Sequence, residues 1–196
     1  MSTLATRNRM GVLSASFSMA LLVGLLWLLE AVDQASGNSL DQFGIEPRSG
    51  EGLLEVFTAP FLHVGWAHVA ANTIPFFVLG VIVLLDGWRQ WLIVTLWVVV
   101  VSGATVWLIS PAGSVTMGAS GVVFGWLTYL MVRGLYTRAP GQVALGVVLL
   151  LFYGGLLLGV LPTDTGVSWQ AHLGGAIGGV LAASRQRRRP VDPRWD

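Results

Sequence analysis

The chain has 196 residues, of which 54% are hydrophobic and only 11% charged. Soluble domains carry about 25% charged residues, so this composition excludes an ordinary soluble domain and indicates a membrane protein. The absence of cysteine excludes disulfides and thiolate metal sites. The net charge of +1 gives no sign of a nucleic-acid partner, and none is expected.

Six apolar segments follow one another along the chain, each close to the ~20 residues that cross the hydrocarbon core of a bilayer. A secretory signal is the alternative for the first, but it is long enough to span and lacks a clear cleavage site, so we expect it to be retained. The fourth and sixth are short and rich in small residues, which favours packing among other helices over contact with lipid. The segments are approximately 13–32, 68–85, 91–109, 117–132, 143–161 and 169–184. Together with the long loop 33–67 and the basic tail 185–196, they predict a single all-α membrane domain over 1–196.

The arginines predict the orientation. With six crossings, ten of the eleven fall on one side of the membrane and only Arg48 on the other. The positive-inside rule makes that side cytoplasmic, with both termini there. The ten are Arg7, Arg9, Arg89, Arg133, Arg138, Arg185, Arg187, Arg188, Arg189 and Arg194. An aromatic belt would place Trp88 and Trp91 at the inner boundary, and Trp66, Trp107 and Trp169 at the outer one.

Polar residues gather near the outer ends of three segments. They are His63, His68, Asn72, Ser120 and His172, and they include all three histidines of the chain. Polar groups inside membrane spans are costly and therefore candidates for function. Their shared depth predicts one common site.

Small residues allow the fourth and sixth segments to approach closely. Gly118 and Gly121 flank the serine, and Gly175 and Gly179 form a small-x-x-x-small face below His172. Close packing would bring Ser120 and His172 within hydrogen-bond reach, as nucleophile and general base. The N-terminal end of the fourth helix would stabilise an oxyanion with its backbone N–H groups, and His68 and Asn72 would add side-chain donors.

No acidic residue lies inside these segments, so a serine–histidine dyad is expected. A triad would require Asp164 to fold back from its loop.

With these motifs in view, the chain resembles the rhomboid family of intramembrane serine proteases. The resemblance rests on Gly118-Ala119-Ser120-Gly121, on Ala171-His172-Leu173-Gly174-Gly175 followed by Gly179, and on His63-x4-His68-x3-Asn72. It covers nearly the whole chain, and the order of the three motifs on six segments is more specific than any one of them.

The resemblance implies Ser120 as nucleophile and His172 as base, with His68, Asn72 and the Ser120 N–H in the oxyanion hole. It implies a structural role for His63 in the first loop and stacking of Phe124 on the catalytic histidine. Many members carry a Trp-Arg pair shortly before the loop histidine, where this chain has Leu54-Glu55. The anchoring of that loop therefore departs from the family pattern.

Several plainer interpretations stay open. Ser120 and His172 would be packing residues in an inactive rhomboid-like protein that binds membrane proteins, and His68 and Asn72 would be polar contacts between helices. Three histidines suit zinc, but no His-Glu-x-x-His motif is present. A small transporter or channel is the other class, although the third and fifth segments offer almost nothing polar to continue a pathway.

We therefore expect a serine endopeptidase in the lipid bilayer that cleaves transmembrane segments of membrane proteins near the outer face. Neither a cofactor nor a metal is expected. The use of arginine without lysine, with many Gly, Ala and Val, suggests a bacterium of high genomic G+C content. The placement of the arginines then predicts an inner-membrane protein with its active site facing outside.

Overall fold

The computed structural model describes residues 10–162 and 166–186, and within these ranges the chain is all-helical apart from one isolated bridge between Ile45 and Thr116. The α-helices are α1 (Val12–Ala35), α2 (Gly52–Glu55), α3 (Trp66–Leu84), α4 (Trp88–Ile109), α5 (Ser120–Thr137), α6 (Pro140–Tyr153) and α7 (Trp169–Ser184). The 3-10 helices are η1 (Asp41–Phe43), η2 (Ala59–Phe61) and η3 (Gly154–Val160). Each of the six predicted segments is helical.

The helix boundaries differ from the predicted ones where glycines intervene. The fourth segment begins its helix at Ser120 rather than at 117, because Gly118 has φ +130° and cannot continue a helix. The fifth is not one α-helix: it changes to a 3-10 helix at Gly154, where two glycines follow each other.

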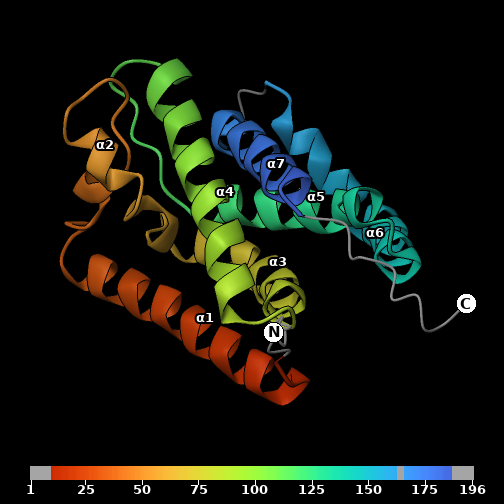
Figure 1. Cartoon of the computed structure of the whole chain (residues 1–196). Coiled ribbons are helices and arrows are strands. Elements are labelled where there is room, and N and C mark those ends of the chain that lie inside the picture. The colour runs from red at the N-terminus through yellow and green to blue at the C-terminus, as the bar shows by residue number, and fades with distance from the viewer. Residues whose placement is uncertain (1–9, 163–165, 187–196) are drawn as a thin grey trace, which may run out of the picture.

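Four of the described helices are long and apolar enough to cross a membrane, namely α1, α3, α4 and the continuous run of α6 and η3. α5 and α7 lie among the others, and most of α5 is buried. The small residues of these two segments thus indicate interior packing correctly. Figure 1 shows α1 on one flank of the bundle and α6 on the other, with α7 packed beside α4 and α5.

Glycines hold α7 between its two neighbours. A Cβ on Gly178 would lie 2.9 Å from the Val98 Cα of α4, and one on Gly175 would lie 2.9 Å from the Gly121 carbonyl carbon of α5. Ordinary contacts of a Cβ begin at about 3.4 Å, so only glycine permits this closeness on both faces.

Aromatic residues fill the core between α3, α4 and α5. The Trp126 ring is fully buried and lies 4.9 Å from that of Phe76 and 5.6 Å from that of Trp91. Trp91 is only 8% exposed, so its predicted place in an aromatic belt was wrong. Trp88, whose ring packs edge-on against Trp91, is the exposed one of the pair.

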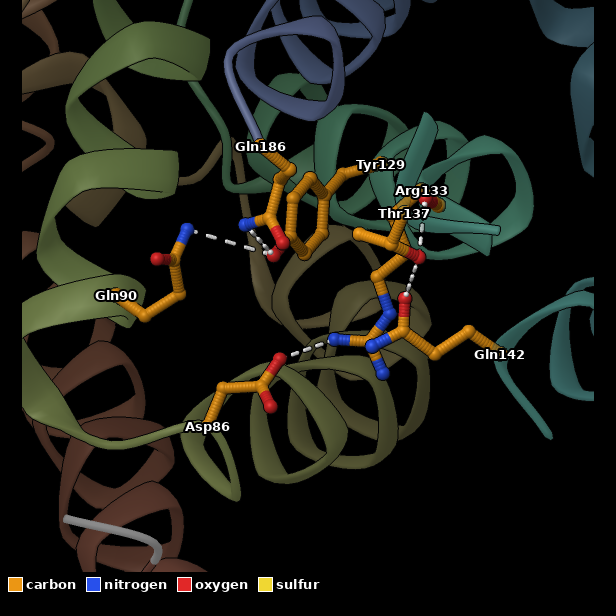
Figure 2. Close-up of polar contacts among 7 residues, drawn as sticks. All are labelled: Asp86, Gln90, Tyr129, Arg133, Thr137, Gln142 and Gln186. Atoms are coloured by element: carbon orange, nitrogen blue, oxygen red, sulfur yellow. Dashed lines mark hydrogen bonds and ion pairs between the residues drawn. The ribbon is translucent and has the colours of Figure 1, made fainter. Parts of the chain in front are cut away.

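A buried polar cluster joins the helices at the end of the bundle opposite Ser120 (Figure 2). Arg133 of α5 pairs with Asp86, at the corner between α3 and α4. The Tyr129 hydroxyl accepts hydrogen bonds from Gln90 of α4 at 3.4 Å and from Gln186 at 2.8 Å. These contacts fix the far ends of the helices that carry the candidate site.

Candidate active site

Ser120 is the first residue of α5 and is half-buried. The turn before it is held by the first loop: the Gly118 N–H donates to the Ala59 carbonyl at 2.9 Å, and the buried Ala119 N–H donates to His63 Nε2 at 3.3 Å. With Gly118 at φ +130°, these contacts fix the direction in which α5 starts. Ser120 therefore stands at the positive end of a helix dipole.

His172 lies in the first turn of α7, three residues after Trp169, and is 4% exposed. Its Nδ1 lies 2.9 Å from the carbonyl oxygen of Gly159. A carbonyl only accepts, so Nδ1 must carry the hydrogen, and the neutral ring then keeps a free lone pair on Nε2. That tautomer is the one a general base requires.

The imidazole of His172 is also fixed by stacking. The Phe124 ring lies parallel to it, with centroids 4.0 Å apart and planes inclined by 6°. Phe124 is one helical turn after Ser120, so this contact places the imidazole against the first turn of α5. The stacking expected for Phe124 is present.

The Nε2 atom of His172 is buried and makes no hydrogen bond within the described part of the chain. The predicted hydrogen bond to Ser120 is therefore not closed in this state. Catalytic hydrogen bonds are often long before substrate binds and shorten in the complex.

His68 presents a hydrogen-bond donor beside Ser120. The Val64 N–H donates to His68 Nδ1 at 3.3 Å, so Nδ1 accepts and the neutral ring carries its hydrogen on Nε2. A Cβ placed on Gly118 would lie 2.9 Å from His68 Nε2 and 3.8 Å from Ser120 Oγ. The absent side chain of Gly118 thus leaves a space bordered by both atoms.

Asn72 lies one turn further along α3 and is buried. Its Nδ2 donates to the His68 carbonyl at 3.0 Å. One of the two amide hydrogens is thereby used within the helix. The observed contact of Asn72 is thus with the backbone of His68, and Asn72 is not among the residues that line the cavity at Ser120.

His63 has the structural position expected of it. It accepts the Ala119 N–H and packs edge-on against His68, with ring centroids 5.1 Å apart. Burial, with a smaller contribution from His68, lowers the pKa of His63 to about 4. The ring is therefore neutral at pH 7, as its role as an acceptor requires.

An open cavity of about 780 Å³ reaches Ser120 from the surface. The start of α3, the segment before α5 and the start of α7 form its walls, and its polar lining includes His68, Ser110, Ser114, Ser168 and Gln170. A smaller cavity of about 20 Å³ lies behind it against Ser102, Gly118 and Gly121. The first admits water to the serine, and the second has room for about one molecule.

The first loop is anchored to α4 by residues other than Leu54 and Glu55. The Arg48 guanidinium donates to the Ser110 carbonyl at 2.9 Å, and Trp107 Nε1 donates to the Ser49 carbonyl at 2.8 Å. Leu54 in α2 is 75% exposed, and Glu55 accepts the Glu46 N–H at 3.3 Å. The loop that carries His63 thus has its own attachment in this chain.

Gly159 is the site residue that sequence reasoning missed. A Cβ there would lie 3.1 Å from His172 Nδ1 and 3.0 Å from Phe124 Cζ, so its backbone lies directly against the imidazole. Its only sequence signal is a glycine within an otherwise apolar span. Asp164, the candidate third member of a triad, lies outside the described residues. No group of three or more potential metal ligands is found among the residues that the structure describes.

Comparison with known proteins agrees with these motifs. The model of the rhomboid domain matches residues 50–189. Uncharacterized proteins of Mycobacterium tuberculosis and Mycobacterium bovis are each 45% identical to the chain over 169 residues, covering 82% of this chain and 70% of theirs. One of Mycobacterium leprae is 41% identical over 186 residues, covering 91% and 74%. With its apolar helices, the chain is an integral membrane protein, and it belongs to the rhomboid family.

Proposed function

We propose that the protein is an intramembrane serine endopeptidase in which Ser120 is the nucleophile and His172 the general base. The observation that carries the proposal is the state of His172. Its Nδ1 is hydrogen-bonded to the Gly159 carbonyl, and its Nε2 is buried without a hydrogen-bond partner among the described residues. His172 lies on α7, which packs through its glycines against α5, the helix that begins at Ser120. A buried base with a free lone pair near a serine suits nucleophilic catalysis.

The reaction proceeds in two halves. Ser120 Oγ attacks the scissile carbonyl carbon while its proton passes to His172 Nε2. The tetrahedral intermediate then collapses, the C–N bond breaks, and Nε2 returns the proton to the leaving amine. Water entering through the open cavity attacks the acyl-enzyme while Nε2 again takes its proton. The bond between the acyl carbon and Ser120 Oγ then breaks, and Nε2 returns the proton to Oγ, which releases the carboxylic acid and restores the serine.

The oxyanion would form in the space beside Gly118. His68 Nε2–H borders that space. The Ser120 backbone N–H and Asn72 would be the other donors to the oxyanion. Such donors, fixed before reaction, are each worth about 10²–10³-fold in rate. No metal or cofactor enters this scheme.

The arginine pattern supports six crossings, with both termini in the cytoplasm and the site near the outer face of a bacterial inner membrane. Arg89, Arg133, Arg138 and Arg185 all belong to the side opposite Ser120 in this topology. The terminal arginines that extend the pattern, at positions 7, 9, 187–189 and 194, lie outside the described residues.

The substrates would be transmembrane segments of other membrane proteins. An intact helix hides its carbonyls in backbone hydrogen bonds, so a segment must unwind locally before Ser120 reaches it. Segments with glycine or other helix-weakening residues near the scissile bond are the preferred class.

The test is cleavage of a model transmembrane substrate by purified protein in liposomes. The parent should cut it, while Ser120→Ala and His172→Ala should not. Ser114→Ala is the matched control, because this serine lines the same cavity but donates to the Pro111 carbonyl and has no place in the reaction. Cleavage by Ser120→Ala at the parent rate would refute the proposal, and binding of the substrate without cleavage by the parent would favour the inactive binder.

A further inference from the structure

The segment that holds His172 in its tautomer, η3, lies at the periphery of the bundle. None of the residues of η3 is buried, and the run of α6 and η3 is the least buried of the four candidate spans. Leu158 is 68% exposed. A 3-10 helix has poorer internal hydrogen-bond geometry than an α-helix, so the position of η3 depends on its contacts with α6 and α7.

Among the described residues, one side-chain hydrogen bond joins η3 to the site, and its partner is the proposed base. Gly159 supplies its carbonyl to His172 Nδ1, and its bare Cα faces both that atom and the Phe124 ring. In the described part of the chain, no carboxylate is recorded as a partner of Nδ1. The state of the base therefore depends on where η3 lies.

η3 has one visible apolar attachment near this contact. Leu157 is partly buried and packs against the main core, whereas the side chain of its neighbour Leu158 is exposed at the surface of the bundle. Two glycines, Gly154 and Gly155, begin the segment, and nothing lies within 4 Å of the Cβ position of Gly155. Loss of the Leu157 contact would therefore loosen the segment that carries Gly159.

We infer that Gly159 is a positioning residue for His172: η3, packed against α7, keeps the Gly159 carbonyl on Nδ1–H and so leaves Nε2 as the free base. This inference rests on the proposed protease function. When η3 is docked, Nδ1–H is held and Nε2 is a free base. A substitution that displaces η3 would take the acceptor away from Nδ1–H, so the imidazole would rotate or take the other tautomer and Ser120 would lose its proton acceptor.

Two matched pairs of variants test the inference. Gly159→Ala places a methyl group at 3.1 Å from Nδ1, while Gly155→Ala makes the same change in open space. Leu157→Ala loosens η3 without touching the imidazole, and Leu158→Ala is its exposed counterpart. We expect kcat to fall about tenfold or more in Gly159→Ala and Leu157→Ala, with KM within about twofold, because displacing a catalytic group by a fraction of an ångström has this effect. Gly155→Ala and Leu158→Ala should match the parent.

The deciding readout is the tautomer of His172, followed by ¹⁵N NMR of labelled histidine in detergent micelles without substrate. The parent should show the Nδ1–H form, and Leu157→Ala should show a mixture of tautomers while helix content stays unchanged. A parent with hydrogen on Nε2, or a Leu157→Ala variant with parent kcat and parent tautomer, overturns the inference. The NMR result does not require catalysis, so failure of the protease proposal would appear separately, as absent cleavage with the tautomer intact.

Discussion

Replacement of Gly175 by alanine should disable the site by separating the two helices that carry it. A Cβ on Gly175 would overlap the Gly121 carbonyl oxygen and lie 2.9 Å from its carbon and 3.2 Å from the Gly121 Cα. All three are backbone atoms, so no change of rotamer relieves the overlap. Ordinary contact begins at 3.4 Å, and α7 must move by about 1 Å, which in an active site lowers the rate by about 100-fold.

The same substitution should lower stability. Overpacking of a well-packed core costs about 1–3 kcal/mol, and Gly175 lies one turn from His172, where α7 packs directly against the backbone of α5. The assay is kcat/KM on a transmembrane substrate together with denaturant unfolding in micelles. Gly24→Ala in α1 is the control, because nothing lies within 4 Å of its Cβ position and alanine favours a helix. Parent activity in Gly175→Ala would refute the close packing that the mechanism requires.

Three further predictions concern single contacts. Phe124→Leu should lower kcat by about 2–10-fold, because a stacked aromatic pair contributes about 0.5–1.5 kcal/mol, and an unchanged kcat would show that the ring does not hold His172. Asp86→Asn should destabilise the protein by about 3 kcal/mol, because it removes the carboxylate that pairs with the buried Arg133. The double variant Asp86→Leu/Arg133→Met should recover stability, as measured by denaturant midpoints, and an equally unstable double variant would contradict the ion-pair explanation. His63 has its pKa lowered to about 4 by burial, from 6.5, so the unfolded chain binds a proton between these pH values that the folded chain does not. The contribution of His63 to the free energy of unfolding is complete above about pH 6.5, and up to about 3 kcal/mol of it is lost as the pH falls to 4. His63→Gln should therefore flatten the dependence of unfolding free energy on pH in this range, and an unchanged dependence would contradict the lowered pKa.

The helices and the gathering of polar residues could be predicted because both depend on local patterns. Apolar runs of about 20 residues mark the spans, and small residues on the fourth and sixth identified α5 and α7 as interior helices. Gly175 and Gly179 do contact α5. The family motifs led to the correct family for the same reason, since they are short and lie in a fixed order.

What the sequence could not predict depends on backbone contacts between distant segments. The Gly159 carbonyl reaches His172 only because η3 leaves the α-helical form, and no side-chain pattern encodes where a carbonyl points. In the sequence, Trp91 is a tryptophan at the end of an apolar segment, as a belt residue would be. Its burial depends on how α4 packs against Trp126 of α5. Likewise, Arg48 is isolated in the sequence, and its attachment to the end of α4 depends on the path of the first loop.

The central claim is that Ser120 is a nucleophile activated by His172. Labelling of the purified protein with a fluorophosphonate, followed by mass spectrometry of its peptides, tests it most directly because no substrate need be known. We predict one adduct on Ser120 in the parent, none in Ser120→Ala, and strongly slowed labelling in His172→Ala. A folded parent that takes up no probe, or an adduct on a different serine, would contradict the account.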